Sequence, residues 1–266
     1  MASARRVTER ARPHLLVVPG PEDVAQAALE GVVVAEREAL ARSGTFRIAL
    51  AGGSTPRRLY QLLASRTDLH FAQWIVGFGD ERWVSAKHPE SNFGMAREAL
   101  LAHVPIPERQ VLAVDTAAGT SQRAAFLYSI ALRRALAPAP GMLPRFDLVL
   151  LGLGADGHTA SLFPDSSALT APAGKIAVAT WAPAPRAWRV TLTAEMVNAA
   201  REVLFVVSGM EKSKALARVM DDTRVGAPPA ATIHPRDGKL SFVVDEAAAQ
   251  LVVPRSAKVD PAILRK

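Results

Sequence analysis

The sequence predicts one α/β domain with a mostly parallel sheet and helices on both faces. Short apolar runs with strand character alternate with helical stretches along the 266 residues, which is the pattern of a parallel sheet. Hydrophobic residues make up 49% of the chain, enough for a sizeable core. The run 146–151 (FDLVLL) is nearly all apolar, as a central strand buried on both faces requires.

The first half of the chain is predicted to contain three strands and four helices, which alternate until two helices follow the third strand. Strands are expected at 14–18, 46–51 and 74–78, and helices at 21–42, 56–65, 92–103 and 121–137. Pro21 stands at a first helical position and Gly44 follows the end of the same helix, as helix start and stop preferences require. Ser91 is the expected N-cap of the third helix.

The second half continues the alternation without a convincing linker. Strands are expected at 146–151, 176–181, 188–192, 203–207 and 242–244, with helices beginning near Thr193 and Glu211 and a last one at 245–251. The segment 226–235 is rich in Pro and Ala and is expected to be a loop. We therefore expect a single domain over 13–266, preceded by a disordered basic tail at 1–12.

Composition excludes several classes of protein. The chain has no cysteine, which excludes disulfide scaffolds, thiolate metal centres and a cysteine nucleophile. No apolar run reaches the roughly 18 residues of a membrane span. The 32 basic and 25 acidic residues give a net charge of +7, but only Arg5, Arg6, Arg10 and Arg12 bunch together, and no apolar segment follows them as in a secretory signal. The charge excess fits an enzyme of anionic small molecules better than a nucleic-acid binder.

Residues that follow the strands are the candidate site, because ligands bind at the carboxyl ends of parallel strands. After the second strand come Gly52, Gly53, Ser54 and Thr55, then a helix. Glycines, hydroxyls and a helix N-terminus together can cradle a phosphate. The Lys of a nucleoside-triphosphate loop is absent. An ordinary capped glycine turn explains the same residues equally well.

Two charged groups follow the third strand. Asp80 could orient a substrate hydroxyl or transfer a proton, and Arg82 could hold an anion or a developing oxyanion. A solvated, salt-bridged loop is the alternative interpretation. Further along, Arg189 begins a strand and Lys212 lies near a helix start, where a cation suggests an anionic partner, although each could be a plain surface charge.

The segment after the central strand, GLGADGH, matches the dinucleotide pattern GxGxxG. We reject a dinucleotide site because Pro164 stops any long helix and the expected acidic position, within 177–181, has none. What remains is a glycine-flanked loop that presents Asp156 and His158. Histidine is the side chain best suited to proton transfer near neutral pH, so this position favours a catalytic role.

Taken together, these segments resemble the 6-phosphogluconolactonase family, within the group that holds glucosamine-6-phosphate deaminase and ribose-5-phosphate isomerase. The resemblance covers about 18–251. It is carried by LAGGSTPRRLY (50–60), GDERWV (79–84), SNFGMAREALL (from Ser91), LGLGADGHTASLFP (151–164), RVTLT (from Arg189) and SGMEKSKAL (from Ser208). The segment GADGHTASLFP is the most specific of these.

The resemblance implies a Rossmann-like sheet and hydrolysis of 6-phospho-D-glucono-1,5-lactone to 6-phospho-D-gluconate, a step of the oxidative pentose phosphate pathway. It places the phosphate at the 52–55 loop with Arg189 and Lys212, proton transfer at His158, and Asp80 and Arg82 in the catalytic site. Asp156 would steer the loop or the imidazole. We expect no cofactor and no metal, a cytoplasmic enzyme, and a phosphosugar lactone as the only partner, with no nucleic acid, membrane or obligate protein partner.

Two alternatives remain open. Deaminase relatives carry an acidic residue five positions after the shared histidine, and this chain has Phe163 there, which argues against deamination or sugar-phosphate isomerisation. A non-catalytic sugar-phosphate sensor should carry a helix-turn-helix module, for which the short region before the first strand leaves no room.

Overall fold

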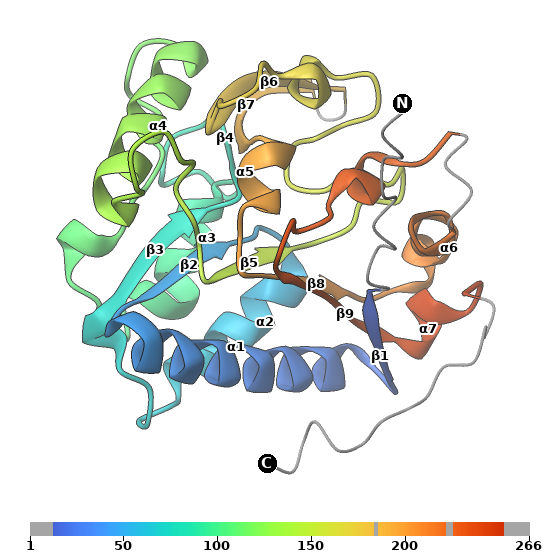
Figure 1. Cartoon of the computed structure of the whole chain (residues 1–266). Helices are drawn as coiled ribbons and strands as arrows, with labels where there is room; N and C mark the ends of the chain where they lie inside the picture. Colours follow the sequence, from blue (N-terminus) through green and yellow to red (C-terminus); the bar gives the residue numbers. More distant parts are fainter. Residues whose placement is uncertain (1–12, 184–185, 222–225, 253–266) are drawn as a thin grey trace, which may run out of the picture.

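The computed structural model describes residues 13–183, 186–221 and 226–252 (Figure 1). The expected disordered tail at 1–12 lies outside these residues. Within them, no helix is long and apolar enough to cross a membrane.

A wholly parallel sheet of six strands forms the centre of the molecule and confirms the predicted fold class. Its order is β1 (His14–Val18), β9 (Lys239–Asp245), β8 (Glu202–Val207), β5 (Leu148–Leu151), β2 (Phe46–Leu50) and β3 (Trp74–Phe78). The predicted central strand, β5, is buried along its whole length, as its apolar sequence requires.

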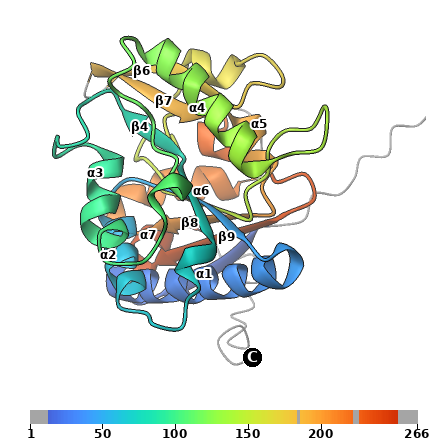
Figure 2. The ribbon, with the colours of Figure 1, turned by 90° about the vertical axis from the view of Figure 1, so that its left-hand side faces the viewer.

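One face of this sheet is covered by helices, and the longest of them lies below the strands in Figure 2. They are α1 (Pro21–Ser43), α2 (Ser54–Ala64) and α3 (Asn92–Ala96). α1 begins at Pro21 and ends at Gly44, whose φ of 65° is left-handed, so both predicted helix signals are confirmed. The predicted helix 92–103 is α-helical only to Ala96 and continues as a π-turn over Arg97–Leu101.

The opposite face is covered by helices and by a second sheet that the sequence analysis did not separate from the first. The helices are α4 (Ser121–Leu136) and α5 (Ala194–Asn198). The small sheet is antiparallel, in the order β4 (Asp80–Arg82), β7 (Arg186–Leu192) and β6 (Ala177–Pro183). β4 was missed in the sequence analysis because its three charged residues have low strand propensity. The strand forms by pairing with β7.

The remaining elements are short. They are α6 (Ser213–Met220), α7 (Glu246–Ala249) and 3-10 turns at Phe71–Gln73, Glu108–Gln110, Ser167–Thr170, Met210–Lys212 and Pro229–Thr232. The last turn lies inside the segment 226–235 that was expected to be a loop, and the last strand is longer than the predicted 242–244.

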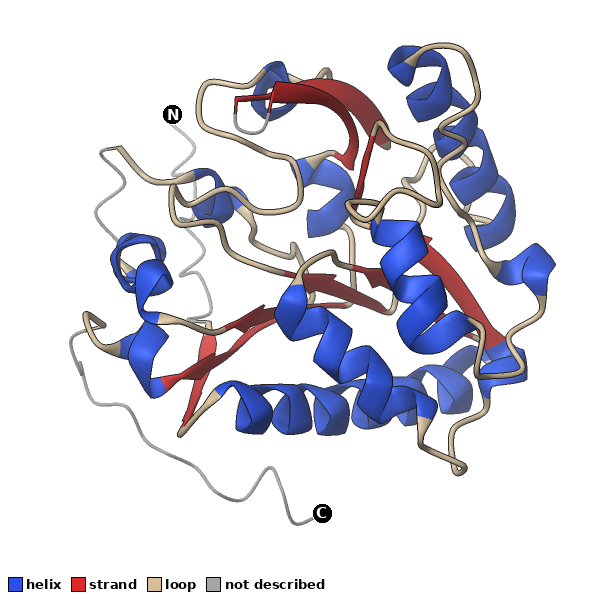
Figure 3. Ribbon diagram, turned by 180° about the vertical axis from the view of Figure 1, so that it is seen from behind, coloured by secondary structure: helices blue, strands red, loops and turns tan. Residues whose placement is uncertain are grey.

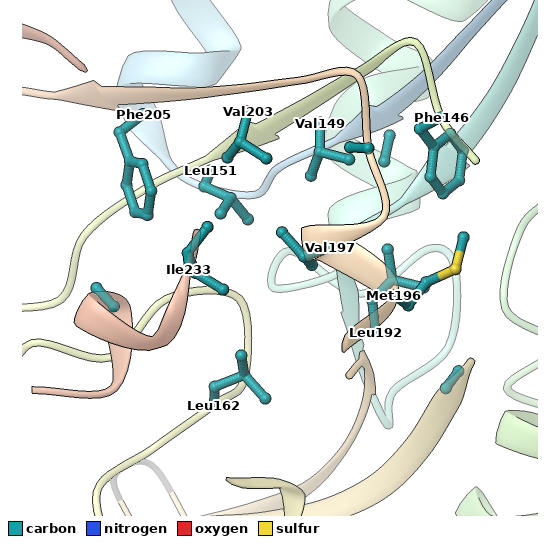
Figure 4. Packing of buried hydrophobic residues seen from close by; sticks show 14 of the residues in the cluster. Phe146, Val149, Leu151, Leu162, Leu192, Met196, Val197, Val203, Phe205 and Ile233 are labelled. Atoms are coloured by element: carbon teal, nitrogen blue, oxygen red, sulfur yellow. The ribbon is translucent and has the colours of Figure 1, made fainter. Parts of the chain in front are cut away.

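The core between the main sheet and the second layer also anchors the loop that carries His158. Figure 4 shows Val149 and Leu151 of β5 facing Val197 of α5. Leu162, four residues after His158, and Ile233 are buried in the same cluster. The loop is therefore held by packed apolar side chains at one end, while the side chains of Asp156 and His158 remain partly exposed.

The carboxyl ends of the central strands meet at one edge of the sheet, seen from behind in Figure 3. From β2 the chain moves outward to β3, whereas from β5 it moves the other way to β8 and β9. β2 and β5 therefore flank the point where the strand order reverses, which is where open α/β sheets bind ligands.

Candidate active site

The predicted phosphate loop opens helix α2. Gly53, with a φ of 112°, is the N-cap residue, and Ser54 and Thr55 are the first helical residues, so their backbone N–H groups have no partner within the helix. Thr55 Oγ1 lies 2.7 Å from Ser208 Oγ, and the two hydroxyls are hydrogen-bonded. This contact brings the turn after β8 beside the loop. Ser208 was not among the sequence candidates.

Lys212 stands on that second turn, as the N-cap residue of α6. Its ammonium lies 3.7 Å from Glu211. Gly209, in the same turn, is held by a hydrogen bond of 3.0 Å from its N–H to Asp245. The contact of Thr55 with Ser208 therefore places Lys212 and the Gly52–Thr55 segment on one side of the site.

Asn92 connects the phosphate loop to the charged residues after β3. Its Oδ1 accepts a 2.7 Å hydrogen bond from Arg82 Nη1, and its Nδ2 donates to Asp80 at Oδ1 (3.1 Å) and at the backbone carbonyl (2.8 Å). A Cβ at Gly52 would collide with Oδ1 of Asn92, so the glycine permits this close approach. Asn92 thus lies between three predicted site residues.

Asp80 is buried, and its other carboxylate oxygen accepts a 2.6 Å hydrogen bond from Ser161 Oγ. The backbone N–H of Ser161 donates to Thr191 Oγ1 at 3.2 Å. Ser161 lies three residues after His158, so Asp80 fastens the histidine loop to the small sheet. The serine was missed because nothing in its sequence neighbourhood marks it beyond a place in the GHTASLFP segment.

The neighbouring Glu81 is also buried but serves helix α3. It accepts hydrogen bonds from the backbone N–H groups of Asn92 (2.8 Å) and Phe93 (2.7 Å) and from Ser91 Oγ (3.2 Å). Burial raises the pKa of Glu81, and these N–H donors oppose the rise. The acidic pair is therefore not a solvated loop, and Glu81 fixes the helix start that carries Asn92.

Arg82 and Arg189 are directly opposite each other in the antiparallel pairing of β4 with β7. Arg189 is only 5% exposed, and its buried Nε has no hydrogen-bond partner among the described residues. Burial and the charge of Arg82 lower the pKa of Arg189. Neither guanidinium forms an ion pair with a carboxylate in the described part of the chain. Like charges directly opposite each other destabilise a sheet, and an anion bound between them would offset the repulsion. The two guanidinium groups are therefore candidates for binding an anion.

His158 and Asp156 form a hydrogen-bonded pair at the end of β5. Nδ1 of the imidazole lies 2.6 Å from Asp156 Oδ1, which also accepts the backbone N–H of His158 at 3.1 Å. Partial burial opposes ionisation of Asp156, but these hydrogen bonds and the charge of His158 lower its pKa below the ordinary value. An ionised carboxylate accepts a hydrogen bond from Nδ1–H and keeps the proton on that nitrogen, so Nε2 is left as the basic nitrogen.

The imidazole is also fixed by its apolar neighbours. A Cβ at Gly154 would collide with the His158 ring, so the ring lies directly against the loop backbone. On another side, the Phe163 ring centroid lies 4.5 Å from that of the imidazole. The position at which the deaminase relatives place an acidic residue is therefore in contact with His158, and it is aromatic here.

The predicted residues thus form two groups. One contains the phosphate loop and Lys212, joined through Ser208. The other contains Asp80, Arg82, Arg189 and the His158 loop, joined through Ser161 and the β4–β7 pairing. Asn92 connects the groups, and among the described residues no hydrogen bond or ion pair joins Lys212 directly to Arg189 or His158.

Comparisons with known proteins identify the family of the chain. The family model described as glucosamine-6-phosphate isomerases/6-phosphogluconolactonase matches residues 19–242. The chain is 40% identical to 6-phosphogluconolactonase of Homo sapiens over 83% of this chain and 87% of that protein. It is 39% identical to 6-phosphogluconolactonase of Synechocystis sp. over 91% and 99%.

Among solved structures, 6-phosphogluconolactonase from Trypanosoma cruzi is similar with a TM-score of 0.83 and 32% identity, covering 92% of this chain and 98% of that one. The sequence match and the structural match both extend over the strands and loops that carry the candidate residues. The chain belongs to the glucosamine-6-phosphate isomerase/6-phosphogluconolactonase family.

Proposed function

We propose that this protein is a 6-phosphogluconolactonase, which hydrolyses 6-phospho-D-glucono-1,5-lactone to 6-phospho-D-gluconate in the oxidative pentose phosphate pathway. The observation that carries the proposal is the Asp156–His158 pair with the Phe163 ring, rather than a carboxylate, packed on the imidazole. The names of the relatives in the family support the same substrate. A cytoplasmic location stays a prediction.

The proposed chemistry needs one base and one water molecule. Nε2 of His158 removes a proton from water as its oxygen attacks C1 of the lactone. The tetrahedral intermediate then collapses, the bond from C1 to the ring oxygen breaks, and the imidazolium returns the proton to that oxygen. Asp156 keeps Nδ1 protonated and stabilises the imidazolium. A positioned general base contributes about 10²–10⁴ in rate.

Substrate binding is assigned to the charged and glycine-rich segments. The 6-phosphate is held by Gly52, Gly53, Ser54 and Thr55 with Arg189 and Lys212, which fixes C1 near His158 at the other end of the sugar. Because Asn92 holds Arg82 beside Gly52, we assign Arg82 to binding of the 6-phosphate as well. Backbone N–H groups then stabilise the oxyanion. Both oxygens of Asp80 accept hydrogen bonds, which supports a positioning role; its part in proton transfer stays a prediction.

His158→Ala tests the proposal most directly. We expect kcat for the lactone to fall by about 10²–10⁴ after subtraction of spontaneous hydrolysis, because the general base is lost. Thermal unfolding should be little changed, since the ring is partly exposed. His103→Ala is the matched control, because that exposed imidazole contacts only a helix carbonyl in the described hydrogen bonds.

Four outcomes would redirect the assignment. Wild-type rates in His158→Ala would remove the histidine from the mechanism. Equal rates on lactones with and without the 6-phosphate would remove the anion site. Release of ammonia from glucosamine 6-phosphate by the wild-type protein, without lactone hydrolysis, would favour the deaminase alternative, and binding without turnover of either would favour a sensor.

A further inference from the structure

The chain has two tyrosines, and both are buried behind the site with the same unusual pair of hydrogen bonds. The Tyr60 hydroxyl accepts from the N–H of Ala51 and donates to the carbonyl of Ala51, both at 2.8 Å. The Tyr128 hydroxyl accepts from the N–H of Phe78 at 2.7 Å and donates to its carbonyl at 2.8 Å. Each hydroxyl therefore makes the two backbone hydrogen bonds that a residue of a neighbouring strand would otherwise make.

The position of Tyr60 coincides with the separation of β2 from β5. β2 pairs with β3 over five residues, but with β5 over only Ile48 and Ala49. The carbonyl of Leu50 accepts from Gly79 on the β3 side, so the next peptide groups, those of Ala51, face the β5 side. There β5 no longer supplies a partner, and a buried backbone group left unpaired is costly. The hydroxyl of Tyr60 satisfies both groups.

Tyr60 also belongs to the helix that the phosphate loop opens. The chain runs from Ala51 through Gly52 and Gly53 into α2, and the Tyr60 side chain returns from that helix to Ala51. Both ends of the loop are thereby fixed to each other. Two glycines restrict the backbone less than any other residues, so such a closure limits the conformations of the loop before a ligand binds. Burial raises the pKa of Tyr60, so the hydroxyl remains a donor.

We propose that Tyr60 is a positioning residue for substrate binding: its hydroxyl closes the gap between β2 and β5 and holds the 52–55 loop in the conformation that receives the phosphate. This inference rests on the proposed function, because it assumes that the phosphate binds at that loop. Tyr60 touches no substrate in this account and acts through the backbone of Ala51.

Tyr128 provides the matched control within the same chain. It makes the same two hydrogen bonds, but from α4 to the end of β3, which is the edge strand of the sheet. It stands behind Gly79 and Asp80 and not behind the phosphate loop. Loss of either hydroxyl leaves one buried N–H and one buried carbonyl unpaired, so the two losses should lower the unfolding temperature comparably.

The experiment compares Tyr60→Phe with Tyr128→Phe. We expect Tyr60→Phe to raise KM for the lactone and the inhibition constant of inorganic phosphate by about tenfold, with kcat within about threefold of wild type. This pattern is expected because the phosphate is bound equally in the ground state and in the transition state. Tyr128→Phe should leave both constants within about twofold of wild type. Equal KM changes in the two variants, or none in Tyr60→Phe, would overturn the inference and leave Tyr60 a purely structural residue.

A second measurement avoids dependence on the folding of Tyr60→Phe. With 3-fluorotyrosine incorporated in place of tyrosine, the wild-type sequence has two fluorine resonances, which Tyr128→Phe assigns. Phosphate should shift the resonance of Tyr60 and not that of Tyr128; an unmoved Tyr60 resonance at saturating phosphate would also overturn the inference.

Two further variants distinguish a wrong phosphate site from a wrong role for Tyr60. Ser54→Ala and Lys212→Ala should each raise KM if the phosphate binds at this loop. If they do so and Tyr60→Phe does not, the phosphate site stands and the inference about Tyr60 fails. If neither raises KM, the phosphate site itself is misplaced, and the inference fails with it.

Discussion

The two ends of the central sheet each gather arginines, but they treat the charge differently. At the amino end, the buried carboxylate of Asp147 lies 2.6 Å from Arg42 and 3.5 Å from Arg47 and from Arg201. At the carboxyl end, Arg82 and Arg189 face each other without such a carboxylate partner in the described chain. The arginines at one end thus have a buried carboxylate within ion-pair distance, and Arg82 and Arg189 at the other end have none in the described chain.

The difference separates structural from functional charge. The Asp147 cluster also satisfies backbone, since its carboxylate accepts the N–H of Arg47 at 2.8 Å, so it joins α1, β2 and β5. Burial and the charge of Arg82 disfavour the charged form of Arg189, and Asp80, Glu90 and Glu81 oppose this effect only in part, so the pKa of Arg189 is lowered. A pair of like charges that lies beside a glycine-rich loop is best explained by an anion that offsets the repulsion. Three substitutions test this contrast.

The largest effect is expected for Arg189→Met. Removing the buried guanidinium should lower kcat/KM for the phosphorylated lactone by about 10²–10³, the size expected when charge-assisted hydrogen bonds to an anion are lost. The unfolding temperature should stay equal or rise, because the repulsion with Arg82 disappears. Arg186→Met, on the exposed start of the same strand, should change neither. A less stable variant with normal kinetics would make Arg189 a structural residue like those around Asp147.

Asp147→Asn should show the reverse pattern. The free energy of unfolding should fall by about 2–4 kcal/mol, because three arginines lose a buried counter-charge. kcat and KM should remain close to wild type, since the cluster lies at the end of the sheet opposite the site. Denaturant unfolding measures the first and lactone hydrolysis the second. Asp237→Asn, whose exposed carboxylate pairs with Arg145, should lose far less stability.

Glu202→Gln tests the amino end more finely. Burial, aided by the charge of Glu38 and opposed by Lys239, raises the pKa of Glu202. A carboxyl whose pKa is higher in the folded than in the unfolded state favours folding while protonated, and this contribution is lost as pH rises through the folded-state pKa. Glu202→Gln should therefore unfold about 2 °C above wild type at pH 8, with the difference vanishing below the ordinary pKa of a glutamate. A difference that is independent of pH would contradict this account.

The sequence predicted most of what depends on local pattern. The strand–helix order, the buried β5 and the boundaries of α1 follow from periodicity and end signals. β4 escaped prediction because strand formation there comes from pairing with β7 and not from its own residues. The π-turn after α3 has no comparable signal in REALL.

The site was predicted in its main groups and not in its connections. The Gly52–Thr55 loop, Asp156 and His158 stand where strand ends place them. Ser161, Ser208 and the two tyrosines act on partners between 9 and 153 positions away, so no local spacing reveals them. Asn92 follows an ordinary N-cap serine, and only the fold shows that its amide forms hydrogen bonds with both Asp80 and Arg82.

The position of β1 has a consequence for the order of synthesis. β1 is an edge strand of the sheet and pairs with β9, so β1 is synthesised long before the strand with which it pairs. At about 5–20 residues per second, the stretch from Val18 to Lys239 takes on the order of ten to forty seconds to produce. β1 suits this delay, because none of its residues is fully buried and Val17 is 38% exposed even in the finished fold. The growing chain therefore exposes for longest the strand of the sheet that the finished fold buries least.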